Sequence, residues 1–285
     1  DLDGQGDLEL VVTYQVSEAV TQALQVYHYG RSEVVSILTD SCSRYELADL
    51  DDDGLAELFC LTSSGAENLA VVKYYDGAEG QLQRSQEQRL SCSYENLRRV
   101  QAARLEDGVS AMLATGVSGD GSLSTDIFLA QGTDLTVLEP KKDVNRGMSA
   151  EFAYPTDVDG DGAVEFPWVE LLPAQTVDST LPSAVRWYSV DSQGTCESQL
   201  VTYASTAGDW YLAFPETWDG AVTVREQEQS VTVSTVDFYH ILAEDRLELD
   251  FSDEKTAERI LTVYTLRGTG RQEYVEEHKL TILRS

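Results

Sequence analysis

The chain has 285 residues, of which 42 % are hydrophobic and 9 % aromatic, so it is long and apolar enough to bury a substantial core and is not a disordered acidic tail. Fifty Asp and Glu residues against 20 Lys and Arg residues give a net charge of −30, which argues against nucleic acid or an anionic membrane surface as a partner. The sequence contains no apolar run long enough for a membrane-spanning helix, and no signal-peptide pattern opens it.

One acidic nine-residue pattern occurs three times, at 1–9, 49–57 and 157–165. In each copy, oxygen-bearing side chains stand at positions 1, 3, 5 and 9, and position 6 is glycine. Such a turn aims alternate side chains at one point, and the glycine lets the backbone bend around a hard cation that takes about six to eight oxygen ligands. The pattern therefore predicts three calcium loops, with Gln5 making the first one weaker. The expected side-chain ligands are Asp1, Asp3, Gln5 and Glu9; Asp49, Asp51, Asp53 and Glu57; and Asp157, Asp159, Asp161 and Glu165. The expected carbonyl ligands, at position 7, are Asp7, Leu55 and Ala163.

The residues that follow the loops favour strands over the helices of a paired-helix calcium hand. Leu8–Thr13, Leu58–Thr62 and Phe166–Val169 are rich in β-branched and aromatic residues, and the last contains Pro167. A helical hand also needs a glutamate at position 12, where this chain has Val12, Cys60 and Trp168.

The spacing of the loops predicts a structural repeat. The second loop begins about 50 residues after the first, and the third follows at about twice that distance, with a degenerate copy between them at Val100–Leu113. There Arg104 takes the place of the first aspartate, so we expect no calcium and a guanidinium available to Glu106 or Asp107; an exposed surface arginine is the alternative. A repeat of this length with several short strands is typical of β-propeller blades.

The three loops, each followed by a hydrophobic strand, resemble the FG-GAP/VCBS repeats of the integrin α-subunit propeller and of many bacterial secreted or surface proteins. The resemblance covers about residues 1–205, although the Phe-Gly and Gly-Ala-Pro signatures are absent and Gln5 replaces an aspartate. It implies a β-propeller of four-stranded blades with calcium loops. From about Gly208 the pattern changes, so we expect an all-β chain in which the propeller is followed by a small C-terminal β-rich (α+β) domain.

The change of pattern at about Gly208 suggests a domain division at 1–206 and 207–285. We expect an incomplete first blade with strands at 8–14, 24–29 and 33–38, because residue 1 is already a loop ligand and the numbering would start inside a longer precursor. Three further blades follow, with turns at Asp76-Gly77, Asp120-Gly121 and Gly132. The blade ranges are 43–90, 98–140 and 150–205. The C-terminal part should contain strands at 231–239, 245–251, 259–266 and Leu280–Leu283, and a helix at Arg271–His278. It resembles a small β-rich domain of bacterial envelope lipoproteins, and a degenerate fifth blade is the rival interpretation.

The four cysteines are widely and irregularly spaced, which fits neither a zinc site nor a disulfide framework. Cys60 lies in a predicted strand and is expected to be a buried small hydrophobe. Cys42 and Cys92 both stand in Ser-Cys-Ser segments, which makes them the favoured pair if any disulfide forms. Cys196 is given no role.

No local pattern in the sequence identifies an enzyme. His28, His240 and His278 are scattered, and there is no nucleophile elbow, phosphate loop or dinucleotide fingerprint. The favoured hypothesis is a calcium-stabilised binding module, exported to the extracellular space or cell envelope because such loops suit millimolar calcium, with a protein or glycan as its ligand. An enzyme acting on polysaccharide or phosphoester and a structural spacer of a surface lipoprotein, with a lipid anchor upstream, are the alternatives.

Overall fold

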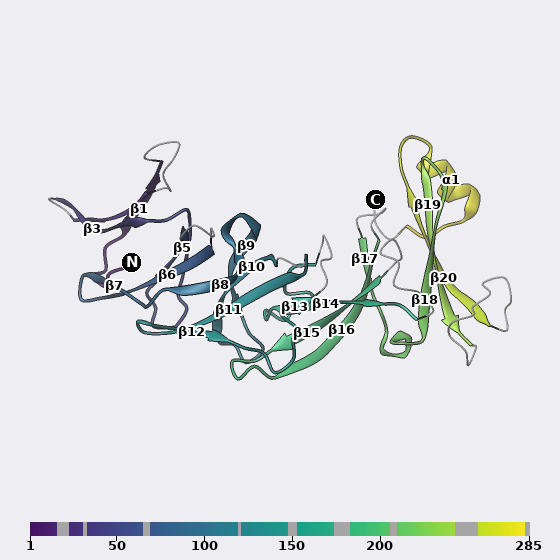
Figure 1. Ribbon diagram of the computed structural model, residues 1–285. Coiled ribbons are helices and arrows are strands. Elements are labelled where there is room, and N and C mark those ends of the chain that lie inside the picture. The colour runs from purple at the N-terminus through teal and green to yellow at the C-terminus, as the bar shows by residue number, and fades with distance from the viewer. Residues whose placement is uncertain are drawn as a thin grey trace. The chain divides into compact units, whose positions relative to one another are not determined.

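In the part of the chain that the structure describes, the protein is all-β apart from one short α-helix and two 3₁₀ turns, as the computed structural model shows (Figure 1). The structure describes residues 1–15, 23–30, 33–64, 69–118, 121–147, 153–173, 183–205, 210–242 and 256–282. Within these residues the strands form five sheets of three to five strands, and none of the five closes on itself. We call them the first to the fifth sheet in chain order.

The first sheet has the order β1-β2-β3, and the second has the order β4-β5-β6-β7, with β8 added beside β6. The three strands of the first sheet confirm those predicted. The bounds are β1 (Glu9–Tyr14), β2 (Ala23–Tyr29), β3 (Val34–Ser41), β4 (Arg44–Ala48), β5 (Glu57–Ser64), β6 (Leu69–Ala78), β7 (Gln81–Arg84) and β8 (Gln88–Ser93). The acidic loop 49–57 joins β4 to β5 as a hairpin, with Ala48 opposite Glu57.

The third sheet repeats this plan without an acidic ligand series. A 3₁₀ turn, η1 (Tyr94–Asn96), precedes it, and its order is β12-β11-β10-β9, with β13 added beside β11. The bounds are β9 (Leu97–Arg104), β10 (Ser110–Val117), β11 (Leu123–Gln131), β12 (Asp134–Leu138) and β13 (Arg146–Gly147). The degenerate copy predicted at Val100–Leu113 is thus a hairpin of β9 and β10.

The fourth sheet has the order β14-β15-β16-β17 and the fifth the order β18-β19-β20. The bounds are β14 (Glu165–Leu171), β15 (Ser183–Val190), β16 (Cys196–Ser205), β17 (Trp210–Ala213), η2 (Glu216–Trp218), β18 (Val222–Ser230), β19 (Val233–Ile241) and β20 (Ala257–Leu266). The strand β17 lies beyond the predicted boundary at 206/207 and pairs with β16. The strand expected at 245–251 lies outside the described residues.

After the fifth sheet comes the helix α1 (Arg271–His278), which confirms the predicted helix. The strand expected at Leu280–Leu283 is wrong for the described residues 280–282, which are not in a strand. The helix ends in a left-handed Lys279, and the amide of Leu280 turns back to donate to the Val275 carbonyl. Because the Leu280 amide is used in this cap, it is not available for pairing with a neighbouring strand.

Alternating side chains of the second sheet face two different cores, as the period of a strand requires. In β5, Leu58 and Cys60 pack with Leu24 and Val26 of the first sheet. Phe59 and Leu61 point the other way and join a core with Met112 and Phe128 of the third sheet, where the Phe59 and Phe128 ring centroids are 5.4 Å apart. The central strands β5 and β6 of the second sheet are therefore buried on both faces, because their side chains are largely apolar on both sides.

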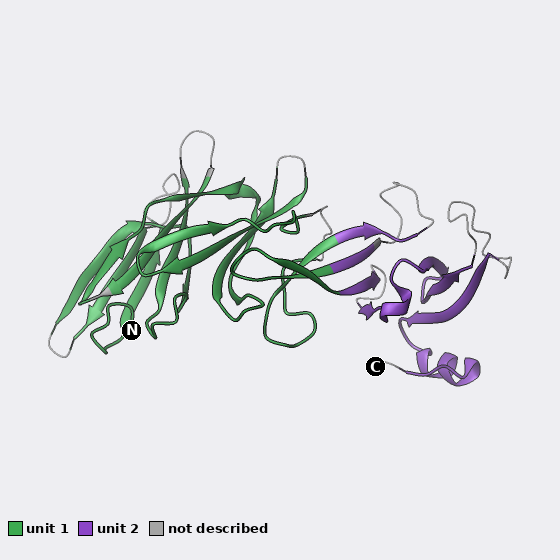
Figure 2. Cartoon of the chain, turned by 90° about the horizontal axis from the view of Figure 1, so that it is seen from below, with its two compact units in different colours: residues 1–168, 187–199 green, residues 169–186, 200–285 purple. Residues whose placement is uncertain are grey.

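Two compact units divide the chain, one of residues 1–168 and 187–199 and the other of residues 169–186 and 200–285 (Figure 2). The first contains the cores just described and a third around Leu113, Ile127 and Phe166. The core of the second is aromatic: Tyr203, Phe214 and Trp218 all contact Phe238, with ring centroids 5.4 to 6.1 Å apart.

Two local predictions are wrong. The disulfide joins Cys42 to Cys60 and not to Cys92, because the β4–β5 hairpin brings their Cα atoms to 5.7 Å, whereas Cys92 lies in β8 as a free thiol. Asp76 and Gly77 do not form a turn but lie inside β6. The turn is three residues later, at Glu79 and Gly80, which both have positive φ. At the other predicted turns, Gly132 and Gly121 have positive φ, and Asp120 lies outside the described residues.

Candidate metal centres

The three acidic loops share one backbone conformation. Positions 4 and 6 have positive φ in every copy, at Gly4 and Gly6, at Asp52 and Gly54, and at Gly160 and Gly162. The same two hydrogen bonds also recur. The amide at position 2 donates to Oε2 of the position 9 glutamate, at 2.6 to 2.8 Å, and the amide at position 6 donates to Oδ2 of the position 1 aspartate, at 2.8 to 3.1 Å. In each position 9 glutamate, the backbone thus fixes Oε2 and leaves Oε1 to face another partner. At position 1, both oxygens of Asp1 and of Asp157 accept backbone amides.

The 49–57 loop brings all four of its predicted side-chain ligands together. Asp49, Asp51, Asp53 and Glu57 each offer a carboxylate oxygen, and these oxygens lie within 4.8 Å of one another. Asp49 Oδ1, Asp51 Oδ1 and Glu57 Oε1 are buried and have no hydrogen-bond partner among the described residues. Buried carboxylate oxygens without donors are costly, and a hard cation bound by oxygen ligands would satisfy all of them. The donor set therefore fits calcium.

The 157–165 loop brings three of its four predicted side-chain ligands together: Asp157, Asp159 and Glu165. Asp161 is outside this group and accepts a hydrogen bond from the Ala163 amide at 2.8 Å. A bridge between Thr156 and Glu165 closes the loop, and Glu165 Oε1 is buried with no partner among the described residues. The position 7 carbonyls of Asp7, Leu55 and Ala163 stay predictions.

The 1–9 loop is built differently. Its carboxylates at positions 3 and 9, Asp3 and Glu9, gather around His28 of β2, a residue that no spacing in the sequence indicates. The Asp1 carboxylate accepts hydrogen bonds from the amides of Gly4 and Gly6 at 2.8 Å each, and it is outside this group. The Gln5 side chain lies against Gly80 of the β6–β7 turn, where an added Cβ atom would be 3.3 Å from its Nε2, and its role as a ligand stays a prediction.

Burial and mutual repulsion dominate the electrostatics of the other two loops. Burial, reinforced by the neighbouring aspartates, raises the pKa of Glu57 to about 8 and that of Glu165 to about 7. A divalent cation among these carboxylates would reverse the effect, because it favours their charged forms. Protons and cations therefore compete for the same oxygens.

The loops also contact the next sheet along the chain. The Gly132 amide, at the β11–β12 turn, donates to Asp51 Oδ2 at 2.8 Å, while Asp51 Oδ1 faces the carboxylate cluster. In the same way the Gly80 amide, at the β6–β7 turn, donates to the Asp3 carbonyl at 2.8 Å. A cation held by the 49–57 loop would thus also fix the position of a residue that binds the third sheet.

In the degenerate loop, the Arg104 prediction is wrong about its partners. The guanidinium donates to the Gly108 carbonyl at 2.8 Å and lies 3.6 Å from Asp52 of the preceding loop. Asp107 instead accepts hydrogen bonds from the Ser192 amide and hydroxyl, at 3.0 and 2.6 Å. The Arg104 and Asp52 side chains are both more than half exposed, so this ion pair adds little stability.

Sequence reasoning missed Asp76 as well as His28. In the first sheet, Glu9 pairs with His28. In the second, Leu58 pairs with Tyr75, so the same register places Asp76 opposite Glu57. Asp76 is buried, and burial together with Asp51 and Asp53 raises its pKa. The signal was present in the sequence, because the segments 26–30 and 72–77 recur, but only the strand register shows which residue of each segment meets the loop.

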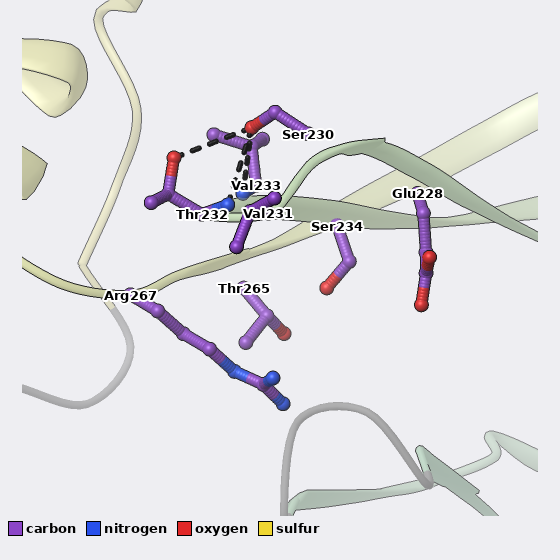
Figure 3. Close-up of a pocket in the computed structure, with 8 residues that line it drawn as sticks. All are labelled: Glu228, Ser230, Val231, Thr232, Val233, Ser234, Thr265 and Arg267. Carbon is purple, nitrogen blue, oxygen red and sulfur yellow. Dashed lines mark hydrogen bonds between the residues drawn. The ribbon is translucent and has the colours of Figure 1, made fainter.

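Two surface hollows are further candidate sites. One, of about 260 Å³, lies at the β18–β19 turn, where Ser230 Oγ accepts hydrogen bonds from the amides of Thr232 and Val233 (Figure 3). The Ser230 hydroxyl oxygen therefore stabilises the turn by accepting these backbone hydrogen bonds. The other, of about 200 Å³, borders the 157–165 loop and is lined by Gln101, Arg104 and Asp157 among others. Both are smaller than the usual range for pockets that enclose an organic ligand, about 300 Å³ and above.

Comparisons with known proteins identify no family. No protein-family profile matches the sequence, and no curated protein does. Among solved structures, a candidate 6-phosphogluconolactonase of Bacteroides fragilis aligns with 91 % of this chain and 82 % of its own, at 11 % identity and a TM-score of 0.29. An endo-arabinase of Bacteroides thetaiotaomicron aligns with 92 % of this chain and 95 % of its own, at 12 % identity and a TM-score of 0.27. Likenesses at this level decide neither the detailed fold nor the activity.

None of the helices in the described part of the chain has the length and apolar character needed to span a membrane.

Proposed function

We propose that the chain is a calcium-stabilised, β-propeller-type binding module of the FG-GAP/VCBS kind, exported to the cell envelope or beyond, with a protein or glycan as its ligand. The observation that carries the proposal is the double use of Asp51. One of its oxygens receives an amide of the third sheet, and the other lies buried and unsatisfied among Asp49, Asp53 and Glu57. A cation in this loop would serve the scaffold, because it stiffens a contact between neighbouring sheets.

Two further features support the rest of the proposal. The sheets of the first unit stack face to face with apolar cores between them, which is how propeller blades bury their faces. The disulfide between Cys42 and Cys60 favours an oxidising compartment, where calcium is also abundant. Aromatic and apolar side chains such as Tyr29 and Leu10, both more than half exposed, offer a surface for a ligand.

The test is thermal unfolding with calcium and with chelator. Ligand that binds only the folded state adds about 2.7 kcal/mol per site at 100 times its Kd, so saturating calcium should raise Tm by several degrees. Glu57→Gln should lose a large part of that rise, because it removes a buried ligand charge. Glu106→Gln, an exposed glutamate in the degenerate loop, is the matched control and should keep all of it.

Equal Tm values with calcium and with chelator would refute the calcium part of the proposal. The binding part is tested by glycan and protein arrays with calcium present, alongside a screen of glycan and phosphoester substrates. Turnover that one carboxylate substitution outside the three loops abolishes, with calcium affinity unchanged, would favour an enzyme instead.

A further inference from the structure

The position that faces the last carboxylate of each loop differs between the first two sheets. In the second sheet, the register places another carboxylate residue, Asp76, opposite Glu57, beside the oxygen cluster of Asp49, Asp51, Asp53 and Glu57. In the first sheet, the residue opposite Glu9 is His28, which adds an imidazole nitrogen. The same backbone frame thus presents a hard, all-oxygen donor set in one loop and a mixed nitrogen and oxygen donor set in the other.

The two carboxylate oxygens nearest His28 lie at the distances from its Nδ1 atom that are expected of ligands to one small ion. His28 Nδ1 is 3.1 Å from Glu9 Oε1 and 3.2 Å from Asp3 Oδ2. An ion bound at about 2.1 Å holds neighbouring ligand atoms about 3.0 Å apart at a right angle and about 3.4 Å apart at a tetrahedral angle. Both measured distances fall between these values.

Charge provides a second and independent argument. The Asp3 and Glu9 side chains are 2 % and 0 % exposed, so two buried carboxylates face one imidazole. A single Nδ1–H makes one good hydrogen bond, which goes to Glu9. Even a protonated ring, with its single positive charge, neutralises only one of the two carboxylates. A dication bound through the Nδ1 lone pair would neutralise both carboxylates and leave the ring in its neutral form.

We propose that Asp3, Glu9 and His28 form a site for a first-row transition-metal dication such as Zn²⁺, which takes the place of the calcium predicted for the 1–9 loop and is separate from the 49–57 and 157–165 loops. Imidazole with carboxylates is a donor set that suits such ions, whereas calcium takes oxygen ligands. The His28 side chain is 22 % exposed, which leaves the site open to solvent on one side. Water can complete the coordination there. This site does not depend on calcium binding at 49–57 or 157–165.

The test is calorimetric titration with Zn²⁺ while millimolar calcium saturates the oxygen sites. We expect one strong Zn²⁺ site per chain, and His28→Gln should weaken it at least tenfold because an amide is a poor substitute for the imidazole nitrogen. His240→Gln, in β19, is the matched control and should bind Zn²⁺ as the unaltered chain does. With Co²⁺ as a probe, the visible absorption of the bound ion should change in His28→Gln and not in His240→Gln.

Calcium-dependent melting separates this proposal from the preceding one. His28→Gln should keep the calcium-induced rise in Tm, which shows that the variant folds and that the 49–57 and 157–165 loops still work. If the unaltered chain shows no strong Zn²⁺ site, or if His28→Gln binds Zn²⁺ equally well, His28 is only an internal partner of the two carboxylates and the proposal is wrong. Strong Zn²⁺ binding without any calcium effect on Tm would overturn the calcium proposal alone.

Discussion

At the scale of single residues, Gly77 shows how closely the first loop approaches the second sheet. A Cβ atom added at Gly77 would lie 1.7 Å from the Leu2 carbonyl oxygen and 3.2 Å from the Asp3 Cα, both backbone atoms that cannot rotate away. Gly77→Ala must therefore push the loop from β6, at a cost of about 1–3 kcal/mol as in other overpacked sites. Urea unfolding measures this loss.

Gly30→Ala is the matched control for that change. A Cβ atom at Gly30 would make only ordinary contacts, the nearest at 3.5 Å, so the same substitution should change stability little. Equal stability of both variants would contradict the close approach. Displacement of Asp3 should also make Gly77→Ala weaken the binding of any cation by the first loop.

The residues that the sequence predicted well are those whose role is local. The repeated series of aspartates, glycine and glutamate fixes the loop backbone by itself, and the structure gives all three copies the same positive-φ positions. His28, Asp76 and the partner of Cys42 could not be found in this way, since each depends on which strand lies beside which. A glycine such as Gly77 likewise signals a turn in sequence, while in the fold it marks a contact with a distant segment.

At the scale of elements, an ion-pair cluster joins β3 to β6. The Asp40 carboxylate lies 2.5 Å from Lys73 Nζ and also accepts a hydrogen bond from the Tyr75 hydroxyl. Burial alone would raise the pKa of Asp40, but the hydrogen bonds from Lys73 and Tyr75 outweigh it and lower the pKa. A lowered folded-state pKa stabilises the fold above the unfolded pKa of about 3.9, and this contribution is lost as pH falls through the folded value.

Asp40→Asn should therefore destabilise the protein at pH 7, by about 3 kcal/mol, because the Lys73 ammonium is buried and loses its counter-charge. The difference from the unaltered chain should shrink as pH falls below about 4, because Asp40 of the unfolded chain becomes protonated first, and it should vanish below the lower folded-state pKa. Urea unfolding from pH 3 to 7 tests this, with the exposed Asp134→Asn as the control. A difference that stays constant down to pH 3 would show that the Asp40 charge is not what stabilises the fold.

Elements were predictable where hydrophobic alternation and loop position agreed. The strands β1, β5, β14 and the helix α1 follow the sequence pattern closely. A strand was expected after α1 because the residues there are apolar. That prediction is wrong, since the cap at the end of the helix determines the direction of the following backbone. Apolar composition indicates that a segment can enter a sheet. It does not show whether a neighbouring strand with free backbone N–H and C=O groups is available to pair with that segment.

At the scale of the whole molecule, the ties between successive sheets provide an internal comparison. The Gly132 amide of the third sheet is held by Asp51 of a candidate calcium loop, and the Ser192 amide is held by Asp107 of the degenerate loop. The two hydrogen bonds have similar donor–acceptor distances, 2.8 and 3.0 Å. Only the first involves a loop that we propose to bind calcium. Removal of calcium should therefore affect them unequally.

Hydrogen exchange with and without a chelator measures that difference. Without calcium, the carboxylates of Asp49, Asp51, Asp53 and Glu57 repel one another, so the loop should open and the Gly132 amide should exchange several-fold faster. The Ser192 amide should keep its rate. In Glu57→Gln, the Gly132 amide should exchange fast even with calcium present, if that glutamate is needed to hold the ion. Equal acceleration at Gly132 and Ser192 would mean that calcium loss loosens the stack as a whole, and no change at Gly132 would mean that the 49–57 loop holds the third sheet without an ion.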